Sequence, residues 1–422
     1  MFRFLLFGLL SALLLTAVNA DPVKDELPVA IDDWPWWRGP NRDGVADPKQ
    51  QPPRSWSDSE NVVWKAAIPG RGHGSPTVVG RYVYLATADE KEQVQSVLCY
   101  ERDTGKLSWQ TPVHKGNFVK GGNSKSSHAS STVCCDGQRL YMNFANNAAV
   151  FTTALSLDGK VLWQTKVTPY VLHQGFGSSP AVYRSLVLVA ADNKGGGAVA
   201  GLERTTGKIV WKVDRPKTPN YASPIVLNVA GRDQLLLTGC DLVTSLDPLT
   251  GNKNWEIKGS TTECVTSTVT DGEHIYTSGG FPKNHLAAVR ADGSSKVAWQ
   301  NGTRVYVPSM LADKGYLYAV LDAGFAVCWK ADTGKELWRG RLGGEFSASP
   351  IRVGEVIYAT NEAGTTFLFK SSGDHFELLG KNQLGQQVLA TPTICGGRIY
   401  MRVATTEKGK RQETLYCLGT NK

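Results

Sequence analysis

The chain has little charge of either sign, and nowhere is charge of one sign concentrated. Of its 422 residues, 46 are Lys or Arg and 38 are Asp or Glu, which gives a net charge of +8. The densest basic cluster, Lys408, Lys410 and Arg411, is typical of a solvated hairpin tip. Because nucleic-acid-binding chains carry a basic arm or stripe, we predict that this protein does not bind nucleic acid.

Long apolar runs are missing too, apart from one at the N-terminus. An apolar run over residues 4–18 follows Arg3 and ends in Val18-Asn19-Ala20, the layout of a secretory signal peptide cleaved after Ala20. The run is short for a membrane span, and no Cys follows the cleavage site to carry a lipid. We therefore expect an exported protein, periplasmic or secreted, with no membrane span and no lipid anchor.

The motifs of common hydrolases and zinc enzymes are also absent. The sequence has no Gly-x-Ser-x-Gly elbow and no His-x-His or His-Glu-x-x-His spacing. Export permits disulfides, but Cys99, Cys328 and Cys417 occupy one repeated position in different units. Equivalent positions are held apart in a repeat fold, so we interpret these cysteines as small buried hydrophobes.

What the chain does contain is one unit repeated eight times. The starts of the units follow a small-Pro-x-Val pattern with variations: Ser75–Val78, Ser130–Val133, Ser179–Val182, Ser223–Val226, Thr266–Val269, Pro308–Leu311, Ser349–Arg352 and Thr391–Ile394. The mean spacing of about 45 residues suits a four-stranded propeller blade.

Each unit continues with alternating apolar residues, an Asp-Thr-Gly-Lys type of turn, and then a Trp. Alternation interrupted by Gly turns indicates β-hairpins. We expect the Trp side chains to hold neighbouring blades together: Trp64, Trp109, Trp163, Trp211, Trp255, Trp299 and Trp338. Unit seven has Leu378 near that place and no Trp.

The unit count closes on itself. The eighth unit ends at residues 416–419 without a fourth strand, whereas the lone strand Val62–Lys65 precedes the first unit and contains Trp64. We predict an all-β, eight-bladed β-propeller of four-stranded antiparallel blades, with the ring closed by this N-terminal strand. The predicted organisation is a signal peptide over 1–20, a Trp- and Pro-rich strap over 21–59 and the propeller over 60–422.

These starts and the Asp-Thr-Gly-Lys-x-x-Trp ends resemble the pyrroloquinoline-quinone-type (PQQ-like) propeller repeat over about residues 60–419. That family includes quinoprotein alcohol dehydrogenases and the BamB-type scaffolds of outer-membrane assembly. In the dehydrogenases a vicinal disulfide lies against the quinone, acidic and amide side chains hold a calcium, and an Asp acts as base.

Little of the dehydrogenase pattern carries over to this sequence. Cys134 and Cys135 are adjacent, but they directly precede the Asp136-Gly137 turn, and strand alternation would send their side chains to opposite faces. No calcium-ligand set and no catalytic Asp match by motif. We expect no cofactor, no metal and no catalytic residue, with quinone and calcium only under the enzyme alternative.

Candidate binding residues lie in the loops that lead into the inner strands, because propellers bind ligands at one end of their channel. We predict a pocket at this mouth from His73, His128, His173, Gln174, Tyr221, Glu263, Tyr306, Glu345 and Gln387. The three histidines come from consecutive blades and could converge on a metal, but their spacing gives that interpretation no support.

The segment Asp33–Gly44 before the propeller contains Trp34, Trp36 and Trp37. We interpret it as a strap that docks its aromatic side chains on the ring; alternatively, the three Trp stack on a sugar or a peptide.

Together these features predict an exported, non-catalytic propeller that binds a protein or an envelope polymer as a BamB-type scaffold does. We expect the propeller to be monomeric. The alternative is a PQQ-dependent alcohol or sugar dehydrogenase that uses the channel-mouth pocket, and a third hypothesis is carbohydrate binding through the three Trp.

Overall fold

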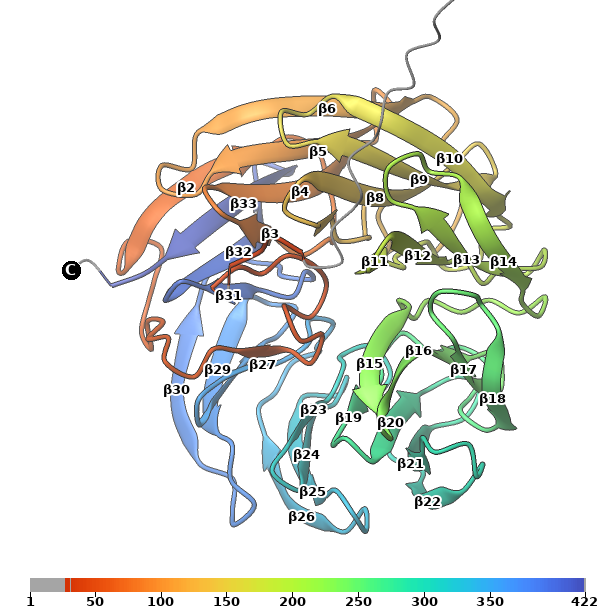
Figure 1. Ribbon diagram of the computed structural model, residues 1–422. Coiled ribbons are helices and arrows are strands. Elements are labelled where there is room, and N and C mark those ends of the chain that lie inside the picture. The colour runs from red at the N-terminus through yellow and green to blue at the C-terminus, as the bar shows by residue number, and fades with distance from the viewer. Residues whose placement is uncertain (1–26, 31, 421–422) are drawn as a thin grey trace, which may run out of the picture.

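Eight small antiparallel sheets stand around a central axis (Figure 1). The computed structural model describes residues 27–30 and 32–420, and the predicted signal peptide lies outside these residues. No helix occurs among the described residues, and none of them therefore forms an apolar helix able to cross a membrane. The predicted eight-bladed propeller is confirmed.

The first four blades follow the chain from the inner to the outer strand. Blade 1 consists of β3 (Thr77–Val79), β4 (Tyr82–Asp89), β5 (Val94–Glu101) and β6 (Leu107–Lys115). Blade 2 consists of β7 (Cys134–Cys135), β8 (Arg139–Asn146), β9 (Ala149–Ser156) and β10 (Val161–Pro169). Blade 3 consists of β11 (Ala181–Tyr183), β12 (Leu186–Ala190), β13 (Ala198–Glu203) and β14 (Ile209–Asp214). Blade 4 consists of β15 (Ile225–Val229), β16 (Arg232–Gly239), β17 (Leu242–Leu246) and β18 (Lys253–Lys258).

The other four blades have the same order, with two additions from the N-terminal segment. Blade 5 consists of β19 (Val269–Thr270), β20 (His274–Gly279), β21 (His285–Arg290) and β22 (Val297–Asn301). Blade 6 consists of β23 (Leu311–Asp313), β24 (Tyr316–Val320), β25 (Phe325–Lys330) and β26 (Glu336–Arg341). Blade 7 consists of β27 (Ile351–Val353), β28 (Val356–Thr360), β29 (Thr365–Lys370) and β30 (Leu378–Gln383), with β1 (Val45–Ala46) parallel to β27. Blade 8 consists of β31 (Thr393–Cys395), β32 (Arg398–Glu407), β33 (Lys410–Leu418) and β2 (Val62–Ile68).

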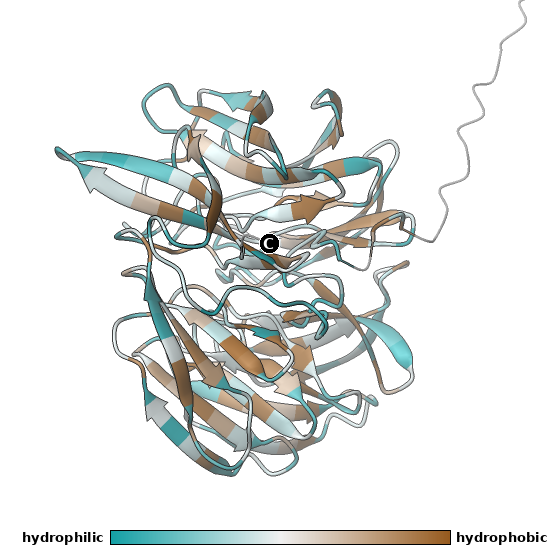
Figure 2. Cartoon of the chain, turned by 90° about the vertical axis from the view of Figure 1, so that its left-hand side faces the viewer, coloured by the Kyte–Doolittle hydropathy of each residue, from teal (hydrophilic) through white to brown (hydrophobic). Residues whose placement is uncertain are grey.

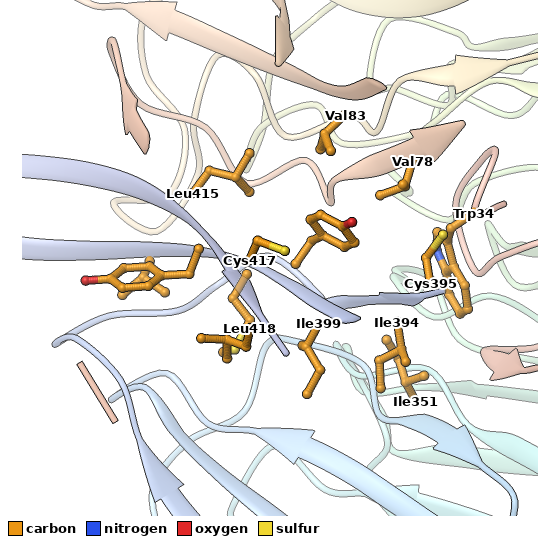
Figure 3. Close-up of a cluster of buried hydrophobic side chains, with 14 of the residues drawn as sticks. Trp34, Val78, Val83, Ile351, Ile394, Cys395, Ile399, Leu415, Cys417 and Leu418 are labelled. Atoms are coloured by element: carbon orange, nitrogen blue, oxygen red, sulfur yellow. The ribbon is translucent and has the colours of Figure 1, made fainter. Parts of the chain in front are cut away.

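Strand β2 closes the ring, as predicted. It pairs antiparallel with β33, and Trp64 lies opposite Cys417. Buried side chains from blades 7, 8 and 1 meet around this closure (Figure 3), among them Ile351, Cys417 and Val78. In the side view the hydrophobic bands fall mainly within the strands (Figure 2), which is the pattern of a fold whose core lies between blades.

The repeated Trp residues contact the Gly turns of the next blade. The ring of Trp163 in blade 2 covers Gly207 in blade 3, whose φ is +73°. A Cβ on Gly207 would lie 2.4 Å from Trp163 Cε3, so the turn needs Gly for its backbone angle and for space. In five blades the indole Nε1 also donates to a main-chain oxygen of that turn: Trp64 to Arg102 (2.9 Å), Trp109 to Leu157 (3.1 Å), Trp163 to Arg204 (3.0 Å), Trp299 to Ala331 (2.7 Å) and Trp338 to Ser372 (2.7 Å).

Two of the seven Trp lack this hydrogen bond to the next blade. Trp211 packs on Gly251 of blade 4, but its Nε1 has no hydrogen-bond partner among the described residues. Trp255 Nε1 donates to Gln234 Oε1 (2.8 Å) inside its own blade. Between blades 7 and 8, where no repeat Trp occurs, Trp56 of the N-terminal segment is buried between Tyr358 and Met401.

A ring of hydroxyl side chains joins the inner strands. In six of the eight units the main-chain N–H at one position donates to the hydroxyl of the next unit: Ser75 to Thr132 (3.0 Å), Thr132 to Ser179 (2.9 Å), Ser179 to Ser223 (2.9 Å), Ser267 to Ser309 (3.0 Å), Ser309 to Ser349 (2.9 Å) and Ser349 to Thr391 (2.9 Å).

This ring corrects the alignment of three unit starts. The residues at the Ser75 position are Thr132, Ser267 and Ser309, rather than Ser130, Thr266 and Pro308 as the sequence pattern predicted. The strand registers agree, since Thr77, Cys134 and Val269 each lie opposite a Tyr of the following strand. Without a Pro to mark the position, matching on small residues alone shifts the alignment.

The N-terminal segment crosses one end of the channel. Trp34 N donates to Val78 O (2.7 Å) in blade 1, and Pro35 O accepts from Cys135 N (2.7 Å) in blade 2. On the far side, Val45 lies opposite Arg352 in blade 7. Trp34 and Trp36 are buried, with 3% and 5% of their surface exposed. The hypothesis of a sugar site made from all three Trp is therefore wrong, because only Trp37 faces the channel.

Candidate ligand-binding channel

A cavity of about 460 Å³ occupies the central channel. All eight blades contribute to its wall, because each loop before an inner strand reaches the axis. Five predicted site residues line it: His73, Gln174, Tyr221, Glu263 and Tyr306.

The floor of the cavity is Trp37. Its Nε1 donates to Ser267 Oγ (2.7 Å), which belongs to the inner hydroxyl positions of blade 5. Further hydroxyls of these positions line the cavity above the floor, including Ser179 and Ser349. The N-terminal segment thus closes one end of the channel and leaves the loops at the other end as its mouth.

One wall holds a buried carboxylate. Glu263 precedes blade 5, is 3% exposed, and its main-chain N–H donates to Phe281 O (3.0 Å). One carboxylate oxygen lies 3.2 Å from His173 Nε2, and the other accepts from Tyr306 OH (3.3 Å). Burial and the charge of Glu263 both raise the pKa of Tyr306, so this hydroxyl keeps its proton and acts as a donor.

The opposite wall holds His73, which precedes blade 1. Its Nε2 is shielded from solvent and has no hydrogen-bond partner among the described residues. Burial, followed by the charges of Arg71, Arg402 and Arg411, lowers the pKa of His73 well below 6.5. The imidazole is therefore neutral at pH 7, and its Nε2 is a buried polar atom without a partner in the described part of the chain.

An ion-pair cluster spans the mouth. Lys125, in the 116–133 connection between blades 1 and 2, places Nζ 2.6 Å from Glu345 Oε2 and 2.8 Å from Glu362 Oε2. The two glutamates belong to the loops of blade 7. Hydrogen bonding to Lys125 lowers the pKa of Glu345. The predicted residue Glu345 therefore lies at the rim and does not line the cavity.

The structure does not bring the remaining predicted residues to the cavity wall. His128 stacks on Phe118 at 4.2 Å between ring centroids and lines a neighbouring cavity of about 470 Å³ beneath the 116–133 connection. Gln387 accepts from Arg411 Nη1 (2.6 Å). His173 reaches the site only through Glu263. No group of three or more potential metal ligands occurs in the described part of the chain.

Sequence reasoning missed several residues of this site. Trp37 lies in the predicted strap, and Lys125 comes shortly before the predicted residue His128; neither was predicted to line the channel. Val265, Phe281 and Leu389 also line the cavity. The repeated Ser or Thr at the unit starts could have indicated the hydroxyl ring. Phe281 lies between the second and third strands of blade 5, and no sequence pattern indicates that this position reaches the channel.

The residues present do not fit a quinone–calcium site of the expected kind. Cys134 packs in the cluster between blades 2 and 3, whereas Cys135 packs in the cluster between blades 1 and 2. Their opposite orientation agrees with strand alternation, and all eight cysteines are buried and unpaired. Glu263 is the only carboxylate among the described residues that line the cavity, which is too few oxygen ligands for calcium.

Comparison with known proteins places the fold in a family. A family model described as outer membrane protein assembly factor BamB matches residues 55–171, 95–324 and 282–374. The outer membrane protein assembly factor BamB of Yersinia pestis is 30% identical over 163 residues, which are 37% of this chain and 37% of that protein. The match thus spans well under two thirds of that relative.

Solved structures from two functional groups resemble the propeller. BamB from Moraxella catarrhalis superposes with a TM-score of 0.61 at 14% identity, covering 84% of this chain and 99% of that chain. A europium-containing methanol dehydrogenase gives 0.63 at 12% identity, covering 93% and 99%. The quinohemoprotein alcohol dehydrogenase of Comamonas testosteroni gives 0.64 at 13% identity, covering 93% and 81%. At these identities the likeness shows the fold alone.

Proposed function

Because the chain belongs to the outer membrane protein assembly factor BamB family, we propose that it is an exported, non-catalytic propeller that binds a protein or an envelope polymer. The observation that carries this proposal is the family match, which extends over residues 55–374. It is supported by a channel that the chain's own N-terminal segment closes at one end, with Trp37 as the floor.

The proposal includes the location and state of the protein. Residues 1–20 would direct export and be removed after Ala20, and the mature propeller would act as a monomer in the periplasm or outside the cell. Mass spectrometry of the N-terminus and light scattering of the purified protein test these two points. An intact residue 1 in the exported protein, or a stable dimer, contradicts them.

The decisive experiment measures outer-membrane protein abundance in cells that lack the protein. We expect a reduced abundance that the wild-type chain restores. A matched preparation of purified protein, supplied with PQQ and with calcium or a lanthanide ion, should reduce no artificial electron acceptor when alcohols or sugars are added. Unchanged outer-membrane protein abundance, or substrate-dependent reduction of the acceptor, overturns the proposal.

The second candidate function is a PQQ-dependent alcohol or sugar dehydrogenase. The observation that favours it is an aromatic-lined cavity of about 460 Å³ with Trp37 as its floor, a size that accommodates a small cofactor. Titration with PQQ tests it directly. Saturable quenching of Trp fluorescence that disappears in Trp37→Leu supports quinone binding in the channel, and the absence of quenching eliminates the candidate.

A further inference from the structure

The channel cavity carries one buried negative charge on its wall. Lys125 and Glu263 are the only charged side chains among the described residues that line it. The ammonium of Lys125 is held at the rim by Glu345 and Glu362 and is therefore already paired. Glu263 is the charged group of the wall that is left for a ligand of opposite sign.

Glu263 keeps capacity for a further hydrogen bond. Each of its two oxygens has one partner, His173 Nε2 at 3.2 Å and Tyr306 OH at 3.3 Å. An ionised carboxylate offers about four acceptor positions, so both oxygens retain unused lone pairs. A buried carboxylate gains most from a partner of opposite charge, because little water reaches it.

Aromatic rings form much of the remaining wall. Trp37, Phe176, Tyr221, Phe281 and Tyr306 line the cavity. Aromatic faces attract cations and also pack against apolar groups, and Tyr306 already has the guanidinium of Arg304 4.7 Å from its ring centroid. A ligand that suits this wall has a positive charge and an apolar body.

The charge is better matched by an organic cation than by a metal ion. Calcium takes about six to eight oxygen ligands, and magnesium requires near-octahedral oxygen geometry. The cavity provides one carboxylate and a set of rings, a combination that recognises ammonium groups. Its volume of about 460 Å³ is that of a small-molecule site.

We propose that the central channel binds an organic ammonium group, which pairs with Glu263 while its apolar part packs among Trp37, Tyr221 and Tyr306. The group belongs either to a free amine or to a lysine side chain of a bound peptide. This site is separate from the assembly role proposed above, and neither depends on the other.

Calorimetric titration of the purified protein tests the site with defined probes. Phenethylammonium chloride should bind saturably, whereas the neutral 2-phenylethanol should bind at least about tenfold more weakly, because it lacks the charge that Glu263 pairs with. N-acetyl-lysine methylamide tests the peptide source. Its binding assigns the site to lysine side chains as well; binding of phenethylammonium alone assigns it to free amines.

Variants locate the binding. Glu263→Gln should weaken phenethylammonium binding at least about tenfold, whereas Glu92→Gln, a change of an exposed carboxylate, should leave it unchanged. If Glu263→Gln does not fold, the comparison of charged and neutral probes on the wild-type protein still shows whether the channel prefers an ammonium group. Equal affinity for phenethylammonium and 2-phenylethanol, or no saturable binding by either ammonium probe, overturns the proposal.

Discussion

The contact between Trp163 and Gly207 leads to a quantitative test of how the blades are joined. Gly207 has a φ of +73°, and a Cβ there would lie 2.4 Å from Trp163 Cε3 and 2.5 Å from Cδ2. Gly231 has nearly the same φ of +74°, but a Cβ there would meet nothing within 4 Å. The two positions share the backbone conformation and differ in the neighbouring ring.

Gly231→Ala should therefore lower the free energy of unfolding only through backbone strain, by about 1–2 kcal/mol for a residue with a side chain in the left-handed region. Gly207→Ala should lower the free energy of unfolding by the same amount and by about 1–3 kcal/mol more, because the added methyl group displaces a packed ring. Urea unfolding followed by Trp fluorescence measures both changes. We expect Gly207→Ala to lower the unfolding midpoint clearly further than Gly231→Ala.

A double-mutant cycle isolates the ring contact. In a Trp163→Leu background the ring is gone, so Gly207→Ala should then cost about as much as Gly231→Ala does. The coupling between the two sites should be about 1–3 kcal/mol. An equal effect of Gly207→Ala with and without Trp163 would refute the reasoning that the ring of one blade packs on the turn of the next.

Three further predictions concern the ring and its charges. Ser309→Ala removes the buried acceptor of Ser267 N (3.0 Å) and should lower the free energy of unfolding by about 1–3 kcal/mol in the same urea assay, whereas a loss within error would contradict a structural role for the hydroxyl ring. Burial lowers the pKa of His114 to about 4 from 6.5, so the unfolded chain binds the proton more tightly; stability should fall as pH drops from about 6.5 towards 4, and His114→Gln should flatten thermal unfolding midpoints over that range. Glu413→Gln leaves the buried Arg402 without its carboxylate (Nε to Oε2, 2.5 Å) and should cost about 3–5 kcal/mol by urea unfolding; a stability change below 1 kcal/mol would be inconsistent with a closure that depends on this pair.

The architecture was predictable because the features that determine it recur locally in the sequence of each unit. The turn Gly, the Trp that follows it and the strand alternation recur in nearly every unit, and each acts over a few residues. The missing last strand and the extra Val62–Lys65 strand predicted the closure that the pairing of Trp64 with Cys417 confirms. A repeated sequence predicts blade number and closure well because every blade packs against its neighbour in the same way.

The site was predictable only in part. His73, Tyr221, Glu263 and Tyr306 were found because the loops before the inner strands must reach the axis in any propeller. Glu345 and Gln387 were chosen by the same rule but turn to Lys125 and Arg411 instead. A loop's position in the repeat says which end of the channel it reaches, but not the direction of each side chain.

By itself the sequence determined the number of blades, the closing strand and the Trp and Gly positions that join them, because these depend on spacing along the chain. Only the tertiary structure decided that Trp37 closes the channel while Trp34 and Trp36 are buried, and that Glu263 faces the cavity from the wall opposite His73. These relations join segments far apart in the chain, and non-repeated contacts leave no periodic signal in a single sequence. The small excess of basic residues dispersed over the chain likewise says nothing of the two carboxylates that the fold gathers around Lys125 at the mouth of its channel.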